Sequence, residues 1–209
     1  MAKKLVRKTP PGATTRTSAG AAGGPDVAPQ ARFASTVAGA SDLEAFARAD
    51  SDESGAPSAS KKLSIELYTD GACTGNPGPG GWGFILRDPE TGKEKEGSGG
   101  DPQTTNNRME LLSVIEGLRT LRRPATVRLV SDSQYVVKGL QEWLKGWKAR
   151  GWRKADKSPV LNKELWEELD RLAAVHDVRP EWIRGHQGHH FNERCDRLAV
   201  AAISQVRRG

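Results

Sequence analysis

The chain has 209 residues, which is enough for one ordinary domain with an attached segment and too few for two large domains. Its formal charge of +6 at pH 7 favours a polyanionic partner, but does not distinguish a nucleic acid from a membrane surface or an acidic protein. The two cysteines exclude a disulfide framework and favour a reducing compartment, and no stretch reaches the roughly 20 apolar residues of a membrane span. We therefore expect a cytoplasmic protein that does not enter a membrane.

Residues 1–60 form the first predicted segment. They consist mostly of Ala, Gly, Ser, Thr and Pro with two aromatic residues, so they cannot bury enough apolar surface to offset their chain entropy. We predict a disordered, low-complexity N-terminal extension, with a short helix around 42–49 as an alternative. The first 25 residues contain five Lys or Arg and no acid, so an organellar transit segment is a second alternative. Residues 61–209 are predicted to form the folded domain.

The folded domain begins with three predicted strands, the last of edge type, at Leu63–Asp70, Trp82–Arg87 and Lys93–Ser98. Glycines and prolines between Gly71 and Gly81 predict a turn after the first strand. Helices and strands then alternate: a helix over 104–121, a strand over 126–131, helices over 133–144 and 161–174, a strand over 177–183 and a helix over 192–206. This order predicts a five-stranded mixed sheet flanked by helices, in the α/β class.

Four acidic residues are candidates for a catalytic site, although each has an ordinary structural interpretation. Asp70 at a strand end is typical of a turn, and Asp132 between a strand and a helix is typical of a cap. Glu110 follows Asn107 by three residues, which is the spacing of a capping box with Asn107 as the N-cap. Asp196 stands beside the apolar stripe of the last helix, where charges are usually just solvated. None of the four identifies a site by itself.

The residues around these acids form four longer motifs. They are 69–73 (TDGAC) with 76–78 (NPG), 104–110 (TTNNRME), 131–136 (SDSQYV), and 185–196, which runs from Gly185-His186 to Asn192-Glu-Arg-Cys-Asp196. In order and spacing they resemble the successive motifs of type 1 ribonuclease H, over about residues 63–208. Residues 1–60 lie outside the resemblance and do not contain the aromatic hybrid-binding domain that some family members carry.

The resemblance implies a ribonuclease H-like sheet whose strand ends bring Asp70 and Asp132 side by side, with Glu110 and Asp196 approaching from helices. Four close carboxylates repel one another unless divalent cations neutralise them, and all-oxygen ligands suit Mg²⁺, with Mn²⁺ as a substitute. The implied reaction is hydrolysis of the RNA strand of an RNA–DNA hybrid with two such ions about 4 Å apart, leaving 5′-phosphate and 3′-hydroxyl ends. The four acids would then be both catalytic residues and metal ligands.

His186 lies between Gly185 and Gln187-Gly188. The resemblance implies a catalytic histidine that moves protons or helps the product to leave, and its titration range suits either role. A zinc site is the alternative, although the glycine-rich context and the acids, which are hard ligands, disfavour it; its ligands would be His186, His189, His190 and Cys195.

The stretch Lys138–Lys157 carries seven Lys or Arg against two acids, with three tryptophans among them. It resembles the basic protrusion that grips the DNA strand, which implies substrate contacts by Trp143, Trp147, Lys148, Arg150 and Trp152. Ala149 departs from the pattern, since relatives often have another cation there, and this predicts a weaker grip. An alternative for Trp143 and Trp147, spaced i and i+4, is that they anchor a helix to the core.

A ribonuclease of this kind must distinguish RNA from DNA through the 2′-hydroxyl group. The resemblance implies such contacts for Asn106, Gln134 and the backbone near Cys73 and Glu110, and contacts with a DNA phosphate for Asn76 and Thr105. The ordinary alternative for Asn106 is a cap at the start of a helix.

Two rival functions remain open at this point. A binding module would hold hybrids without cutting them, which the basic segment alone would support but the four acids oppose. An integrase or junction resolvase of the same fold would act on DNA, but the motifs at 104–110 and 185–196 favour ribonuclease H. We therefore predict a metal-dependent endoribonuclease, a hydrolase acting as a cytoplasmic monomer with an RNA–DNA hybrid as its partner.

Overall fold

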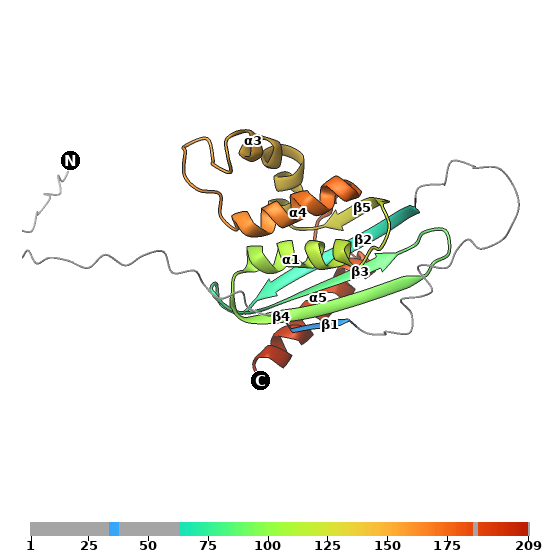
Figure 1. Cartoon of the computed structure of the whole chain (residues 1–209). Helices are drawn as coiled ribbons and strands as arrows, with labels where there is room; N and C mark the ends of the chain where they lie inside the picture. The colour runs from blue at the N-terminus through green and yellow to red at the C-terminus, as the bar shows by residue number, and fades with distance from the viewer. Residues whose placement is uncertain (1–33, 38–62, 186–187, 209) are drawn as a thin grey trace, which may run out of the picture. The chain divides into compact units, whose positions relative to one another are not determined.

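The computed structural model describes the backbone of residues 34–37 and all atoms of residues 63–185 and 188–208. Six strands form one mixed sheet in the order β1-β4-β3-β2-β5-β6 (Figure 1). The strands are β1 (Ala34–Val37), β2 (Leu63–Cys73), β3 (Gly78–Arg87), β4 (Glu94–Thr104), β5 (Ala125–Ser131) and β6 (Asp177–Trp182). The first four strands pair antiparallel, whereas β2, β5 and β6 run parallel. The predicted mixed α/β sheet is confirmed.

Helices cover both faces of the sheet (Figure 1). On one face lie α1 (Asn106–Arg119), α4 (Lys163–Val175) and the continuous helical stretch α2 (Gln134–Lys138), η1 (Gly139–Trp143) and α3 (Leu144–Ala149). The other face is covered by α5 (His190–Val206), which contacts β2, β3 and β4. The sheet is therefore the middle layer of three.

Two apolar clusters hold these layers together. The larger one lies between the sheet and α1 to α4, and it includes Ile65, Leu67 and the fully buried Trp166. The smaller one, built around Tyr68, joins the sheet to α5 and contains the buried thiol of Cys195. Ile65 and Leu67 of β2 face the larger cluster and Tyr68 faces the smaller one, because neighbouring side chains of a strand point to opposite faces of the sheet.

One strand was not predicted. β1 lies in the segment expected to be disordered and pairs antiparallel with β4, from Ala34 opposite Gly100 to Val37 opposite Gly97. The expected edge strand β4 therefore has a neighbour along residues 97–100. The other expectations for residues 1–60 fall on residues outside the described ones.

The turn predicted from Gly71 to Gly81 is wrong in its extent. β2 continues to Cys73 and β3 already begins at Gly78, so only four residues separate them. The glycines serve packing instead: a methyl group on Gly81 would lie 2.2 Å from the carbonyl oxygen of Ala199, and one on Gly83 would lie 2.7 Å from that of Cys195. These glycines let α5 approach the sheet backbone closely.

Helix boundaries also differ from the prediction, by two residues at the start of α1, α4 and α5. The helix expected over 161–174 begins at Lys163, because Asn162 has a left-handed backbone conformation with φ 56°. The helix expected over 133–144 runs from Gln134 to Ala149, with a π-helical turn in the middle. Among the described residues, no helix combines the length and apolar character that crossing a bilayer requires.

The close approach of α5 predicts an unequal response to two glycine substitutions. We expect Gly81→Ala to lower the free energy of unfolding by about 3 kcal/mol, because the methyl group would meet the backbone of Ala199. Gly92→Ala should cost only about 1 kcal/mol, since Gly92 has a positive φ but no atom near the added carbon. Urea unfolding of both variants measures the difference, and equal losses would contradict this packing argument.

Candidate active site

Two of the predicted acids are brought together by the pairing of parallel strands. Thr69 of β2 lies opposite Ser131 of β5, and this is the last pair of their ladder. The next residues, Asp70 and Asp132, therefore stand side by side where the ladder ends. Asp70 does not end its strand as predicted, since β2 continues and pairs Asp70 with Gly83 of β3.

Glu110 reaches this position from α1. A methyl group on Gly71 would lie 2.3 Å from the backbone nitrogen of Glu110, so the glycine allows the helix to contact the strand directly beside Asp70. The sequence indicated a turn that begins at Gly71. The structure shows instead that Gly71 lies inside β2 and permits close packing of α1. The backbone N–H of Gly71 also donates a 2.7 Å hydrogen bond to the Asp70 carboxylate.

The capping-box alternative for Glu110 is wrong as well. α1 begins at Asn106 with Thr105 as its N-cap, so Asn107 lies inside the helix. Glu110 does not bond back to Asn107; its carboxylate accepts a 3.1 Å hydrogen bond from the side-chain amide of Asn106. Ser133 caps α2 by accepting a bond from the N–H of Val136, which leaves the Asp132 carboxylate without a capping role.

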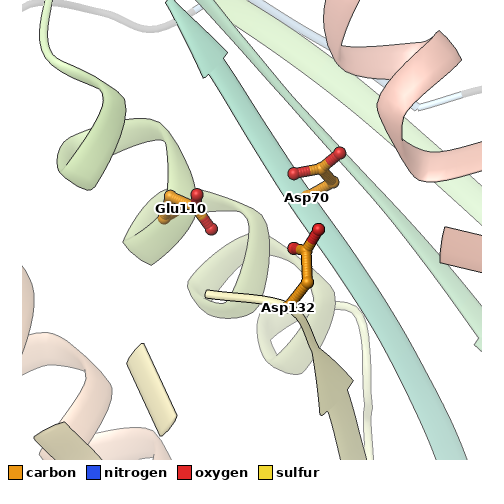
Figure 2. A group of neighbouring side chains, drawn as sticks. All are labelled: Asp70, Glu110 and Asp132. Carbon is orange, nitrogen blue, oxygen red and sulfur yellow. The ribbon is translucent and has the colours of Figure 1, made fainter. Parts of the chain in front are cut away.

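The three carboxylates of Asp70, Glu110 and Asp132 form one group, with one oxygen from each within 4.8 Å of the others. Figure 2 shows them facing one another from β2, α1 and the end of β5. Burial is the main cause that raises the pKa of Asp70 to about 7, and the Asp132 charge adds to it. Burial, with the charges of Asp70 and Asp132, raises the pKa of Glu110 to about 8. The negative charges of the three carboxylates are therefore not balanced by neighbouring positive charges strongly enough to offset their burial and mutual repulsion.

These residues fit a divalent cation. All donors are carboxylate oxygens, which suit Mg²⁺ or Mn²⁺ better than zinc or copper. The second carboxylate oxygen of Glu110 is buried and has no hydrogen-bond partner in the described part of the chain. A buried acceptor without a partner costs free energy that a bound cation would recover.

The other two predicted catalytic residues are placed differently. Asp196 lies half-buried on α5, outside the three-carboxylate group, yet its charge helps to raise the pKa of Asp70. His186 is outside the described residues. The zinc alternative gains no support, because Cys195 is fully buried in the core and the only candidate metal group within 63–185 and 188–208 is the acidic one.

The segment around β6 and α5 holds Asp132 through residues that the sequence analysis did not single out. The side-chain amide of Asn192 donates to the Asp132 carboxylate at 3.3 Å, and the indole N–H of Trp182 donates to the Asp132 carbonyl oxygen at 3.0 Å. Gly185 packs so closely that a methyl group on it would lie 2.5 Å from the same carboxylate. Asn192 stands inside a recognised motif, but no local pattern pointed to Trp182.

Several of the predicted substrate-contact residues lie close to the carboxylate residues along the chain, and Asn106 bonds to one of them. The backbone N–H of Asn106 donates to the side-chain oxygen of Asn76, and Thr105 precedes Asn106 at the start of α1. The thiol of Cys73 lies at the end of β2 and donates weakly to the backbone of Gly78 and Thr104. Gln134 is exposed at the first residue of α2, two residues from Asp132.

The basic segment 138–157 divides into buried and exposed parts. Trp147 is 9% exposed and packs edge-on against Trp166, as the core-anchor alternative predicts, while Trp143 and Trp152 are half-buried. Lys148 is exposed and forms a 2.8 Å ion pair with Asp170 of α4. The Arg150 guanidinium donates to the backbone carbonyl of Arg153. In this segment the tryptophans are therefore buried or half-buried, whereas Lys148 and Arg150 are exposed.

The fold and the site define an α/β protein with a carboxylate centre suited to a divalent cation. The family model of RNase H matches residues 62–204. Over 161 residues the chain is 56% identical to the ribonuclease H of Pelobacter propionicus, an alignment that covers 77% of this chain and 97% of that protein. It is 58% identical over 142 residues to the ribonuclease HI of Caulobacter vibrioides, covering 68% and 94%. The chain belongs to the ribonuclease H family, in its bacterial type, and the prediction of a hydrolase is confirmed.

Solved structures agree with this assignment. The fold is similar to that of LC9-RNase H1, a type 1 RNase H with the type 2 active-site motif, with a TM-score of 0.64 and 34% identity over 71% of this chain and 75% of that one. It is also similar to LC11-RNase H1 in complex with an RNA/DNA hybrid, with a TM-score of 0.54 and 27% identity over 68% and 97%.

The raised pKa values predict how stability depends on pH. Asp70 and Glu110 bind protons more tightly in the folded protein, at pKa about 7 and about 8, than at their ordinary values of 3.8 and 4.5. Their contribution to stability is therefore fully present below about pH 4 and is lost as the pH rises to 8. In EDTA we expect the free energy of unfolding to fall between pH 5 and pH 8, by up to about 1.4 kcal/mol per pH unit for each of the two carboxyl groups below its folded-state pKa.

Two controls isolate the carboxylates as the cause. Asp70→Asn removes one of the repelling charges, and excess Mg²⁺ neutralises them, so either should flatten the dependence. Urea unfolding at several pH values measures it. If the free energy of unfolding falls equally steeply with pH in the wild type, in Asp70→Asn and in the wild type with excess Mg²⁺, other groups are responsible.

Proposed function

We propose that the chain is an endonuclease that hydrolyses the RNA strand of RNA–DNA hybrids and leaves 5′-phosphate and 3′-hydroxyl ends. The observation that carries the proposal is the meeting of Asp70, Glu110 and Asp132 at one edge of the sheet. The names of the relatives support it, and so does the similar LC11-RNase H1, which was solved with an RNA/DNA hybrid. We extend the proposal to a monomer in the cytoplasm, a setting with which two free thiols are compatible.

The residues of the proposed mechanism divide into three tasks. Asp70, Glu110 and Asp132 would hold the cations, and Asp196 would complete the set from α5. Two bound Mg²⁺ ions would supply activation of the attacking water and stabilisation of the leaving 3′ oxygen. Asn106 fixes the Glu110 carboxylate through its amide. His186 carries protons to or from the reacting groups.

Substrate binding is assigned to two surfaces beside this centre. Asn106, Gln134 and the backbone near Cys73 are assigned to the RNA 2′-hydroxyl groups, and Asn76 and Thr105 to a DNA phosphate. The basic segment supplies cations that neutralise phosphates of the DNA strand without reading its sequence. Trp143 and Trp152, which are half-buried between the cations in the sequence, are assigned to contact with sugars.

Cleavage of a panel of duplexes tests the proposed function. The panel contains an end-labelled RNA–DNA hybrid, double-stranded RNA, double-stranded DNA and DNA with a single ribonucleotide. We expect Mg²⁺-dependent cleavage of the hybrid's RNA strand alone, abolished by EDTA, with mass spectrometry of the products showing 5′-phosphate ends. Asp70→Asn should remove the activity, because it deletes a proposed ligand. Asp88→Asn is the matched control, since Asp88 lies in the turn after β3.

Three other results would reject or redirect the proposal. Tight binding of the hybrid without cleavage would favour the binding module. Equal cutting of double-stranded DNA would indicate a nuclease of another type on this fold. Full activity of Asp70→Asn would remove the carboxylate group from the reaction.

The basic segment predicts a separate effect on substrate affinity. Neutralising Lys148, Arg150 and Arg153 to Gln should raise KM about 10-fold at physiological salt and reduce its salt dependence, because fewer counterions are released. The value of kcat should stay within about twofold. Asp170→Asn should have the opposite effect on KM, since it frees Lys148 from its ion pair. Steady-state kinetics between 50 and 200 mM salt measure both, and a loss confined to kcat would contradict the assignment.

A further inference from the structure

Trp182 is an unusual tryptophan because 45% of its surface is exposed while its one polar atom is bonded inside the protein. It is the last residue of β6 and pairs with Ser131, the last residue of β5. Its indole N–H donates at 3.0 Å to the carbonyl oxygen of Asp132. An exposed ring on a strand end thus reaches the backbone of a carboxylate residue of the site.

This bond continues the strand ladder past its end. The N–H of Ile183 donates to the carbonyl of Ser131 at 3.0 Å, and the following carbonyl, that of Asp132, receives the indole N–H where no strand partner follows. Asp132 lies between the end of β5 and the capping residue Ser133. The peptide that joins Asp132 to Ser133 is held at both of its polar groups: its carbonyl oxygen accepts the indole N–H, and its N–H donates to the Ser131 hydroxyl at 3.1 Å. The indole therefore helps to hold the peptide plane that sets the direction of the Asp132 side chain.

The strand that carries Trp182 is itself tied to the helical face. The side-chain amide of Gln141 in η1 donates at 2.9 Å to the carbonyl of Pro180, two residues before Trp182. Gln141 and Trp182 line the same hollow, together with Gln134 and Lys138. The indole ring is thus supported on one side and open to solvent on the other, as its exposed fraction requires.

We propose that Trp182 is a positioning residue that orients Asp132 for cation binding through its indole N–H, rather than a contact for the substrate. The inference rests on the proposed function in that it assigns the cation site to Asp70, Glu110 and Asp132. It requires no contribution of the Trp182 ring to hybrid affinity. Mutation of a residue that hydrogen-bonds to a metal ligand typically lowers metal affinity or activity by roughly 10- to 100-fold.

Trp182→Phe tests the proposal, because it keeps an aromatic ring and deletes the N–H donor. We expect the Mg²⁺ dissociation constant of the full chain, measured by titration calorimetry without nucleic acid, to rise about 10-fold. In cleavage assays, kcat at limiting Mg²⁺ should fall by a similar factor, while KM for the hybrid stays within about twofold.

Trp166→Phe is the matched control. It also deletes an indole hydrogen bond, the 2.9 Å bond from Trp166 to the hydroxyl of Tyr135, but in the core away from the carboxylates. It should lower the melting temperature at least as much as Trp182→Phe and leave the Mg²⁺ dissociation constant unchanged. A merely structural role for Trp182 would make the two variants behave alike.

The outcomes separate this proposal from the proposed function. An unchanged Mg²⁺ dissociation constant in Trp182→Phe overturns the positioning role, and an increase in KM alone with unchanged Mg²⁺ binding does so too, because it indicates a substrate contact. Weaker Mg²⁺ binding in Trp182→Phe supports the role even if no hybrid is ever cleaved, since the calorimetry needs no substrate.

Discussion

Repulsion among three partly buried carboxylates is the interaction around which this structure is organised. Asp70, Glu110 and Asp132 offer oxygens within 4.8 Å of one another, and burial makes the charges of Asp70 and Glu110 less favourable. Such a group persists only because strong secondary structure holds its members: a strand interior, a buried helix and the end of a parallel ladder. The stability of the sheet thereby maintains an arrangement that is unfavourable until a cation binds.

The close contacts that make this arrangement possible depend on residues without side chains. Gly71 brings α1 against β2, and Gly81 and Gly83 bring α5 against β3. Both helices carry acids of the proposed site, so each glycine contact sets the distance of an acid from the sheet. A larger side chain at these positions would move a whole helix, because the nearest atoms are backbone atoms. Packing and chemistry are therefore coupled through the same few positions.

Periodicity predicted five of the six strands and their order along the chain, and the motifs that resemble ribonuclease H named the three acids that meet. Prediction failed where distant contacts override local patterns. The capping box at Asn107 was outweighed by Asn76, thirty residues away, whose side chain receives the N–H of Asn106 at the helix start. The glycines between 71 and 81 have the composition of a turn, and only the approach of α1 and α5 explains their use inside strands.

Asp132 is held differently from the other two carboxylate residues. Asp70 is held within a strand and Glu110 within a helix, so their backbones are fixed by regular hydrogen bonds. Asp132 follows its strand and precedes its helix, and it needs side-chain partners, which Trp182 and Asn192 provide from a later part of the chain. These partners come from β6 and α5, the elements that flank His186. A change in that segment therefore reaches the carboxylate group through Asp132, whereas the basic segment, which we propose to bind the DNA strand, has no such connection among the hydrogen bonds of Asp132.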